Sequence, residues 1–507
     1  MRGSRTSAPY CARPVTLSAP SWRTGRVPIT SYGLSVATMR SSPSSGVRRS
    51  RRLRRDPPCI VANPPVMPMP EGSRGCGRDR RSPSVLSLPR RRRTVRARSW
   101  PIAARKEQLM PSPLEGIRIL DFTRYQNGPH GTQLLADMGA EVLKVELPGD
   151  GDPGRSVMRL PDGFSAYFEA LNRGKRSITL ELRTEEGREV IRKLVPEVDV
   201  VVENFRPGVL DRLGIGYDDI APLNPKLIYA VNSGFGPDGE WSSRGSFDHV
   251  AQGMSGALVA QGGGPGATPT SVAWGLADQV GGMTLAYGVM TALLARERFG
   301  VGQKVDVSQL GAMISLQGFS LLAYLHTGKQ ERRNPGASRN AAFSWYQASD
   351  GEWFTIAGLD PKFWPRICRV LEREDLIDDP RSAEPFARFD NGPWLAGELS
   401  AVFATKPREE WLRALIEAEV PCGPVYDYAG VAAEPQHWQN GYLIDLEHPT
   451  FPGHRTIGMS VQLSETPGGV RAPAPELGQH TEEILLELGY DWPDIEQLHD
   501  RGVTAAR

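Results

Sequence analysis

Between residues 116 and 307, short apolar runs alternate with longer stretches of helical period. Runs of strand length occupy six segments, 116–122, 141–146, 177–182, 199–205, 226–231 and 303–307. Helical patterns lie between them, the clearest at 131–138, 184–195 and 277–296. Buried strands separated by helices at this spacing are typical of a doubly wound parallel sheet. We therefore predict a large α/β domain of the Rossmann-like class.

The pattern changes after about residue 330. Residues 328–342 are polar and are expected to be a linker. A strand at 352–357 is followed by three amphipathic helices, at 361–372, 394–403 and 407–418. This order predicts a smaller α+β domain.

Strand and helix patterns return in the last part of the chain. Thr481 is expected to cap a helix over 482–488. In the same way, Thr184, which is followed by Glu185 and Glu186, is expected to cap the helix that ends near residue 195. We predict four segments: a tail at 1–109, the first part of the large domain at 110–327, the small domain with its linkers at 328–435, and a return to the large domain at 436–507.

The helix predicted over 277–296 carries the first chemical signal. It is apolar nearly all round, so we expect it to be central and buried. Asp278 opens it, and Gly281 and Gly282 follow one turn later and keep the space beside the carboxylate clear. Because a helix start carries partial positive charge and unpaired N–H groups, the carboxylate is expected to be ionised and open to a ligand. The simpler interpretation is an N-cap aspartate beside a Gly–Gly packing contact.

The charge of the chain is divided between two unlike parts. Residues 1–109 hold 24 Lys and Arg against 4 Asp and Glu, whereas the remainder holds 36 against 54. The tail shows no helix or strand period and no apolar face. Three interpretations remain: a nucleic-acid-binding arm, an organellar transit peptide, or translated sequence upstream of a true start at Met110. We favour the third and leave the tail out of the fold argument.

Cysteine, histidine and hydropathy exclude several classes of protein. Only Cys368 and Cys422 lie in the body, and the eight histidines lack metal-binding spacing, so neither a disulfide framework nor a metal site is expected. The longest apolar run, 283–295, is too short to cross a bilayer. We expect a cytoplasmic protein without membrane contact. The loop at 123–129 lacks the dinucleotide fingerprint, although ligands still bind beyond the carboxyl ends of parallel strands.

Several motifs occur in an order that identifies a family. They are Leu120–Thr123 (LDFT) with Gln126–Pro129 (QNGP), Asp137–Glu146 (DMGAEVLKVE), Asn172–Ile178 (NRGKRSI), Val202–Gly214 (VENFRPGVLDRLG), Gly300–Gln303 (GVGQ) and Val420–Val425 (VPCGPV). With these motifs the chain resembles the family III CoA-transferases, the CaiB/BaiF type represented by formyl-CoA:oxalate and carnitine CoA-transferases. The resemblance covers about 112–500, and its several independent motifs make it specific.

The resemblance implies both an assembly and a reaction. Family members form a homodimer in which two subunits interlock like links of a chain, and the linkers beside the small domain fit that arrangement. The substrates would be an acyl-CoA thioester and a free carboxylic acid, with no permanently bound cofactor and no metal. The position of the family's nucleophilic aspartate is Asp278, which would form an aspartyl anhydride and then an enzyme–CoA thioester. Oxyanion donors would come from the backbone near Gly281 and from Gln126.

The resemblance also implies contacts to CoA. Tyr125 and Gln126 would lie near the thioester, and Phe247 and Asp248 near the pantetheine. The residues expected around the adenine and phosphates are Leu182, Arg183, Asn204, Phe205, Arg206 and Arg212. Arg206 and Arg212 supply the charge that phosphates need, although Arg212 on a solvated helix face and Phe205 in the core are the simpler interpretations.

Two departures from the family pattern limit the prediction. The oxalate enzyme closes its site with a run of four glycines that has no counterpart after residue 266, which argues against oxalate or formate as substrate. The α-methylacyl-CoA racemases of the same fold use the equivalent aspartate together with a histidine as an acid–base pair. In this chain the position of that histidine is Phe247, and His249 lies on the other side of Asp248. Racemisation is therefore disfavoured, and it is kept as the alternative enzyme function. An inactive homologue, or a nucleic-acid binder acting through the tail, is the further alternative.

Overall fold

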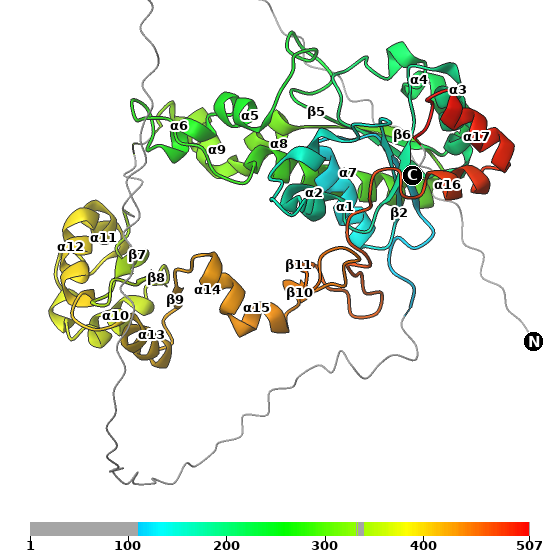
Figure 1. Ribbon diagram of the computed structural model, residues 1–507. Helices are drawn as coiled ribbons and strands as arrows, with labels where there is room; N and C mark the ends of the chain where they lie inside the picture. The colour runs from blue at the N-terminus through cyan, green and yellow to red at the C-terminus, as the bar shows by residue number, and fades with distance from the viewer. Residues whose placement is uncertain (1–109, 331, 333–338, 506–507) are drawn as a thin grey trace, which may run out of the picture. The chain divides into compact units, whose positions relative to one another are not determined.

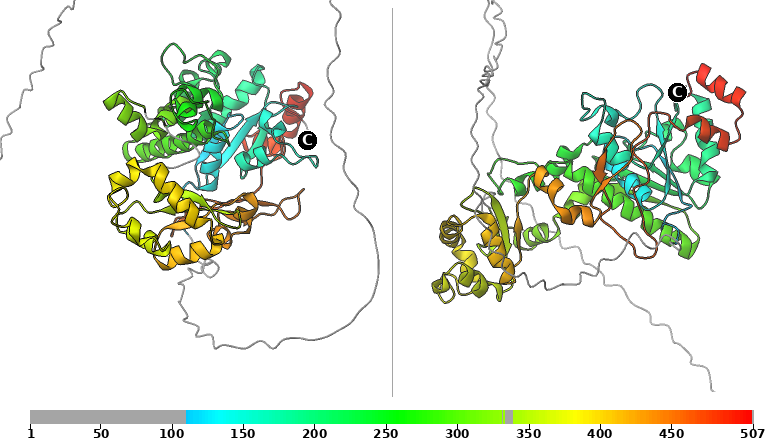
Figure 2. Two further views of the ribbon diagram at one scale, coloured as in Figure 1. Left: turned by 90° about the vertical axis from the view of Figure 1, so that its left-hand side faces the viewer. Right: turned by 60° about the horizontal axis from the view of Figure 1, so that its bottom comes forward.

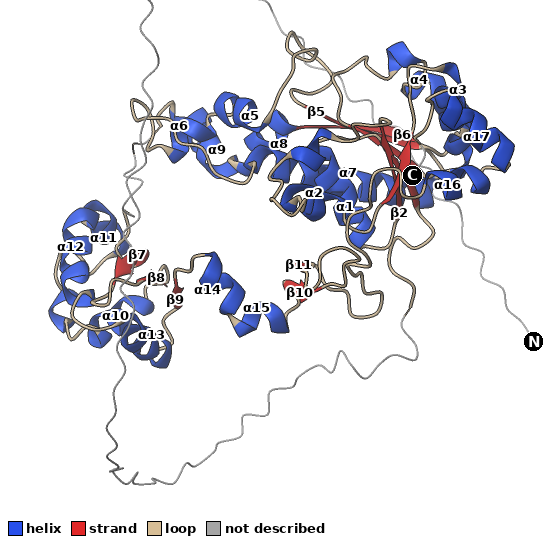
Figure 3. Cartoon of the chain, viewed as in Figure 1, coloured by secondary structure: helices blue, strands red, loops and turns tan. Residues whose placement is uncertain are grey.

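The computed structural model describes residues 110–330, 332 and 339–505, so the predictions for the tail lie outside the described residues. Figures 1 and 3 show the main sheet with helices around it. Its six parallel strands lie in the order β3-β2-β1-β4-β5-β6. Their bounds are β1 Arg118–Asp121, β2 Glu141–Glu146, β3 Arg176–Thr179, β4 Val200–Glu203, β5 Ile228–Ser233 and β6 Gln303–Ser308. All six predicted strands are present, and this order is that of a doubly wound sheet.

Helices cover both faces of the sheet because alternate strand residues point to opposite sides. Ile119 and Val200 belong to the core beneath α1 (Asn127–Asp137) and α7 (Leu276–Phe299). Leu120 and Val201 belong to the core on the other face, which includes residues of α3 (Glu185–Leu194), α4 (Tyr217–Ile220), α16 (Thr481–Glu487) and α17 (Trp492–Asp500). Figure 2 shows the two C-terminal helices, in red, beside strands from the first half of the chain, and α16 contacts β3.

Shorter elements complete the part of the chain that carries the main sheet and the segments that follow the small domain. They are α2 Ala166–Asn172, α5 Asp248–Met254, α6 Ala257–Gln261, α8 Gln309–Leu316, α9 Gly318–Thr327, α14 Tyr428–Ala433, α15 Pro435–Gln439, β10 Leu443–Asp445 and β11 Arg455–Ile457. Short 3₁₀ turns lie at Pro153–Ser156, Val195–Glu197, Asp211–Leu213, Ala221–Leu223 and Glu374–Leu376. No helix within the described ranges is long and apolar enough to cross a membrane.

The smaller α+β unit contains an antiparallel sheet and its own core. Its elements are β7 Phe343–Gln347, β8 Trp353–Ala357, β9 Cys422–Pro424, α10 Phe363–Val370, α11 Pro385–Asp390, α12 Gly392–Phe403 and α13 Arg408–Glu417. Trp364, Phe403 and Trp411 are fully buried in that core. The predicted strand and the three predicted helices of this region are all present. The exact domain boundaries stay a prediction.

The helix caps differ from expectation in part. Thr184 caps α3 as predicted, since its side chain accepts a hydrogen bond from the Gly187 N–H. Thr481 is instead the first residue of α16, and its hydroxyl accepts a hydrogen bond from the Thr179 N–H of β3 at 3.1 Å. Helix α1 begins at Asn127, four residues earlier than predicted, because Pro129 lies in its first turn, where a proline costs no hydrogen bond. Gln126 is therefore the N-cap residue of α1.

The prediction that the long apolar helix is central and buried is confirmed for one side of the helix only. One side of α7 packs on the sheet and α1 through residues such as Leu285 and Val289. The other side exposes a stripe of large apolar side chains, Met283, Tyr287, Met290 and Leu294. A helix on the face of a sheet has a free outer side unless another layer covers it, and within the described chain no layer covers this one.

Candidate active site

The site begins where the strand order reverses, between β1 and β4. Adjacent parallel strands whose chains leave in opposite directions open a crevice at their carboxyl ends. Asn204, which follows β4, clamps the loop that follows β1. Its side-chain oxygen accepts from the Arg124 N–H at 2.9 Å, and its amide nitrogen donates to the Arg124 carbonyl at 2.8 Å and to Asn127 Oδ1 at 2.6 Å. Asn204 therefore positions Tyr125 and Gln126.

Two left-handed backbone segments meet at this crevice. Tyr125 has φ 61°, and Trp274 and Gly275 before α7 have φ 66° and 67°. The Gln126 side chain donates to the Trp274 carbonyl at 2.7 Å, and a Cβ on Gly275 would lie 2.7 Å from the Gln126 amide. Glycine is therefore required at 275. Non-glycine residues in this conformation store strain and concentrate at functional sites.

Asp278 lies in the first turn of α7 but does not cap the helix. The N-cap is Gly275, and Asp278 is the third residue of the helix. Its Oδ1 accepts a hydrogen bond from the side-chain amide of Gln309. Burial raises the pKa of Asp278 to about 7; the Gln309 hydrogen bond acts in the opposite direction, and the negative charge of Asp248 adds to the rise. The expectation of a firmly ionised carboxylate was therefore wrong, because desolvation outweighs the helix dipole here.

Asp248 is buried and holds the start of α7. Its Oδ1 accepts from the Ala277 N–H at 2.7 Å and its Oδ2 from the Gln252 side chain at 2.6 Å. Phe247 is 64% exposed and meets the Tyr125 ring edge-on at 5.6 Å between centroids. The segment is the start of helix α5 and not an extended strand, yet His249 still points outward, with its side chain 74% exposed.

Of the two glycines after Asp278, Gly282 serves close packing, whereas a Cβ on Gly281 would meet no atom closer than 3.5 Å. A Cβ on Gly282 would lie 2.7 Å from the Asn127 carbonyl oxygen and 2.8 Å from His130 Cδ2 of α1. Gly281 lies inside α7, so its N–H belongs to the helical ladder. This removes the Gly281 N–H from the expected oxyanion donors. Gln126 is placed beside α7, but its amide nitrogen already donates to the Trp274 carbonyl.

The residues expected around the adenine and phosphates lie at the edge of the crevice. Phe205 lies under the Arg124 guanidinium, 5.2 Å from it, and Arg206 reaches the segment before Phe247, since a Cβ on Gly245 would lie 2.4 Å from its Nη2. Arg206 and Arg212 are exposed, and in the described ranges neither forms an ion pair with a carboxylate.

Leu182 and Arg183 differ from the others in their surroundings. The Leu182 side chain belongs to the core, so only its backbone faces outward to a ligand. The Arg183 side chain is 80% exposed and pairs with Glu181 at 2.6 Å. The structure thus brings six predicted residues together around α7 and the β1 loop, whereas Leu182 and Arg183 follow β3 and contact other residues. The grouped residues are Tyr125, Gln126, Asn204, Phe247, Asp248 and Asp278.

Comparison with known proteins decides the family. The sequence pattern of CoA-transferase family III matches residues 114–481. The chain belongs to this family. The acetyl-CoA:oxalate CoA-transferase of Acetobacter aceti is 37% identical over 344 residues, which cover 68% of this chain and 88% of that protein. The succinyl-CoA–D-citramalate CoA-transferase of Chloroflexus aurantiacus is 34% identical over 400 residues, covering 78% and 99%.

A solved structure supports the same assignment. The CaiB/BaiF family protein from Brucella suis is 34% identical, covers 75% of this chain and all of its own, and has a TM-score of 0.66. The predicted resemblance is therefore confirmed, and the chain is a transferase of family III.

A buried charge network beneath the crevice was not predicted. Lys144 of β2 is fully buried and donates to the Thr123 carbonyl at 2.8 Å, and it pairs with Asp152 at 2.9 Å. Asp152 in turn accepts from the Tyr125 N–H at 3.0 Å. Lys175 pairs with Asp121 at 3.0 Å; burial alone would raise the pKa of Asp121, but Lys175 and Lys144 lower it to about 2. In this transferase, fixed charges thus hold the Tyr125 loop from below.

Two further polar residues near Asp278 escaped the sequence prediction. Gln309 directly follows β6, at the carboxyl end of a parallel strand, and that position alone could have indicated it. Tyr167 of α2 lies close enough that the charge of Asp278, after burial, raises the pKa of its phenol. Nothing local in the sequence around Tyr167 indicates that proximity.

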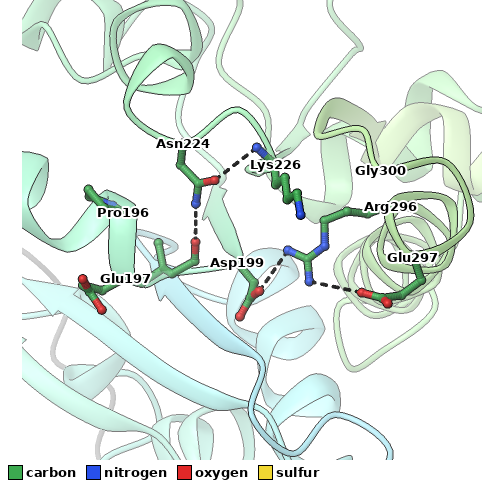
Figure 4. A pocket seen from close by; sticks show the side chains of 9 residues that line it. Pro196, Glu197, Asp199, Asn224, Lys226, Arg296, Glu297 and Gly300 are labelled. Carbon is green, nitrogen blue, oxygen red and sulfur yellow. Dashed lines mark hydrogen bonds and ion pairs between the residues drawn. The ribbon is translucent and has the colours of Figure 1, made fainter.

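Two cavities lie away from the crevice. One of about 530 Å³ opens at the amino ends of β4 and β5, the opposite end of the sheet (Figure 4). There Arg296 pairs with Asp199 at 2.9 Å, and the Asn224 amide donates to the Val198 carbonyl at 2.9 Å. The other, of about 440 Å³, lies between α7, β6 and α8 and is lined by Val280, Thr284, Asp306, Val307, Ser308, Gly311, Ala312, Ser315 and Leu316. Both adjoin α7, the first near its C-terminal end at Arg296 and the second near its N-terminal half at Val280 and Thr284, closer in sequence to Asp278.

Proposed function

We propose that this transferase moves CoA between an acyl-CoA and a free carboxylic acid, with Asp278 as the covalent nucleophile. The observation that carries the proposal is the carboxylate of Asp278 at the start of α7, half-buried beside the Tyr125–Gln126 loop at the carboxyl end of the sheet. Burial makes this carboxylate more basic than one in water, which favours its attack on a thioester carbonyl.

The proposed reaction has four covalent steps. The Asp278 carboxylate attacks the thioester carbon, the C–S bond breaks, and CoA leaves as a thiolate from an aspartyl–acyl anhydride. The thiolate attacks Cγ of Asp278 and expels the donor acid, leaving an aspartyl–CoA thioester. The acceptor carboxylate then attacks Cγ and expels the thiolate. The thiolate attacks the acceptor carbonyl and frees Asp278, so neither a redox change nor an external energy source is required.

The CoA site that we propose extends from the crevice to its exposed edge. The N-termini of α1 and α7 both open beside Gln126, and helix N-termini attract anionic groups. Arg206 and Arg212 offer the phosphates guanidinium groups that form no ion pair among the described residues. Tyr125 and Phe247 form an exposed aromatic pair beside the nucleophile, which suits the pantetheine chain.

The identity of the acceptor acid is to be found by testing a panel of carboxylic acids. The names of the relatives pair acetyl-CoA with oxalate in one protein and succinyl-CoA with D-citramalate in another. This chain lacks the run of four glycines expected of an oxalate enzyme. We therefore do not commit the site to oxalate, and a mixture of mono-, di- and hydroxy acids should be tested.

The test uses the full chain with a panel of acyl-CoAs and ¹³C-labelled acids in deuterated water, read by mass spectrometry of the CoA esters. Labelled CoA esters are expected from the native protein and from Glu297→Ala, an exposed change on the same helix. Asp278→Ala should abolish the exchange and leave CoA binding largely intact. Retained exchange in Asp278→Ala would reject the nucleophile, and deuterium at the α-carbon without exchange would favour a racemase.

We also propose that the active form is an interlocked homodimer. The exposed stripe of α7 is supported by a second apolar surface on α9, where Phe319, Leu322 and Leu325 are largely exposed. Exposed apolar surfaces of this extent are typical of permanent interfaces.

A further inference from the structure

The two oxygens of Asp278 lie in different surroundings. Oδ1 accepts a hydrogen bond from the Gln309 side-chain amide, whereas Oδ2 accepts none from any residue in the described ranges. Such a division matters for the proposed reaction, because one carboxylate oxygen must attack while the other stays on Cγ as a carbonyl oxygen.

The position of Gln309 is fixed by its backbone and by burial. It is the first residue of α8, directly after β6, and the residue is 4% exposed. Ser308 caps the helix by accepting from the Gly311 N–H at 3.0 Å, and the Leu310 N–H donates to the Gly234 carbonyl at 3.1 Å. Because the residues on both sides of Gln309 are held by hydrogen bonds and its amide is buried, the position of its N–H donor is fixed. An oxyanion contact requires a donor with a fixed position.

The other expected donors near Asp278 make no hydrogen bond to its carboxylate in the described chain. The Gly281 N–H is within α7, and the Gln126 amide nitrogen donates to the Trp274 carbonyl. The Ala277 N–H donates to Asp248. Gln309 is therefore the side-chain donor that the structure places on the nucleophile itself.

We propose, resting on the function proposed above, that Gln309 is a catalytic residue that stabilises the oxyanion formed at Cγ of Asp278. In each attack on Cγ, the carbonyl π electron pair moves to Oδ1 and returns when the leaving group departs. In the second step the leaving group is the donor carboxylate, which takes Oδ2 with it. In the third step the leaving group is the CoA thiolate. The Gln309 N–H already lies on Oδ1 and strengthens its hydrogen bond as negative charge collects there.

This role predicts an uneven effect on the steps of the reaction. The first attack places its oxyanion on the substrate carbonyl and not on Oδ1, so Gln309 affects it less. A variant without the donor should still release CoA thiolate but should complete the attack on Cγ slowly, and water then hydrolyses the waiting anhydride. The rate of acyl-CoA hydrolysis should therefore rise relative to the rate of CoA exchange.

The test compares Gln309→Met with Gln317→Met in the full chain. Gln317 lies at the other end of α8 and donates to backbone carbonyls of Ser255 and Met313, so its change also removes an amide from the same helix. The probes are acetyl-CoA with ¹³C-acetate and succinyl-CoA with ¹³C-succinate. Exchange is followed by mass spectrometry, and total CoA release by a thiol reagent.

For Gln309→Met we expect exchange to fall by roughly 100-fold even well above pH 7, the loss seen when one oxyanion donor is removed. The ratio of hydrolysis to exchange should rise, and the midpoint of the pH profile should move to higher pH. Gln317→Met should change at most the melting temperature; its pH midpoint and its ratio of hydrolysis to exchange should match those of the native protein.

The outcomes separate this inference from the proposal on which it rests. If Asp278→Ala still exchanges label, both are rejected. If Asp278→Ala is inactive while Gln309→Met exchanges within about twofold of the native protein at every pH, with an unchanged midpoint, only the role of Gln309 is rejected. An equal rise of the hydrolysis ratio in Gln317→Met would also reject it, because a structural loss would then explain the effect.

Discussion

At the scale of single residues, burial sets the chemistry of Asp278. The carboxylate lies at a helix N-terminus, which favours the charged form, yet burial and the charge of Asp248 raise its pKa to about 7. At neutral pH the residue is divided between acid and carboxylate. The carboxylate form is the nucleophile, so the proton must leave before the first attack.

This pKa predicts the pH dependence of exchange. Below about pH 7 the carboxyl is protonated, so the rate should fall about tenfold for each further pH unit, and above about pH 7 it should level off. Initial rates of label exchange between pH 5 and 9, at low acyl-CoA concentration, measure this profile. A profile that stays flat down to pH 5 would contradict the raised pKa of the nucleophile.

A second buried carboxyl, Glu203 at the end of β4, bears on stability. Burial raises its pKa to about 7, against the hydrogen bond that it accepts from the Phe205 N–H at 2.8 Å. The folded state therefore binds more protons than the unfolded state between about pH 4.5 and 7, and stability falls as pH rises through that window. Glu203→Gln keeps an acceptor for Phe205 and should raise the free energy of unfolding at pH 8 by up to roughly 3 kcal/mol.

Glu146 provides the control of opposite sign. Burial would raise its pKa, but the Arg155 guanidinium, 2.7 Å away, holds it below its usual value. Glu146→Gln should therefore destabilise the protein, and more at pH 7 than at pH 4. Denaturant titrations of both variants at three pH values give the comparison, and the same sign for both would contradict the assignment of the two pKa shifts.

At the scale of elements, the contact between α1 and α7 positions the site. Both helices begin beside Gln126, and Gly282 of α7 lets the backbone of α1 approach closely. A Cβ on Gly131 of α1 would in turn lie 2.9 Å from the Gly282 carbonyl oxygen. The distance between the two helices therefore sets the distance between the Gln126 loop and Asp278.

We expect Gly282→Ala to destabilise the protein by about 1–3 kcal/mol, because the new methyl group would meet the Asn127 carbonyl of α1. Exchange activity should fall as well, since α1 must move. Gly397→Ala in α12 is the matched control: its Cβ meets nothing within 4 Å, and alanine should stabilise that helix by up to about 1 kcal/mol. Thermal unfolding of the two variants should give shifts of opposite sign.

At the scale of the whole molecule, exposed apolar surface indicates the assembly. The outer stripe of α7 lies on a helix whose inner side is buried, whereas α9 buries none of its residues in the described chain. A monomer in water gains nothing from such surface, so we infer a second subunit as its partner.

The double variant Leu322→Glu with Leu325→Glu should therefore convert a dimer to monomers of about 55.6 kDa and reduce exchange. Ile416→Glu places a charge at a single exposed apolar residue of α13 and should leave the dimer intact. Sedimentation equilibrium measures both. A native protein that sediments as a monomer would reject the dimer outright.

The sequence by itself determined the sheet and the family, and it indicated the candidate nucleophile. Strand and helix periods are local properties, so the six parallel strands, α7 and the α+β unit were all predicted, and consecutive motifs such as Val202–Gly214 identified the family. Asp278 was indicated by its neighbours in the chain. Its role as nucleophile stays a proposal for the experiments above.

Only the tertiary structure decided how Asp278 is surrounded. Its pKa depends on burial by elements far away in the chain, and its donor, Gln309, is separated from it by the rest of α7 and all of β6. Lys144 and Asp152 reach the Tyr125 loop across strands, and the outer side of α7 is exposed because no described layer covers it. Burial and through-space contacts sum over residues distant in sequence, so no local pattern contains them.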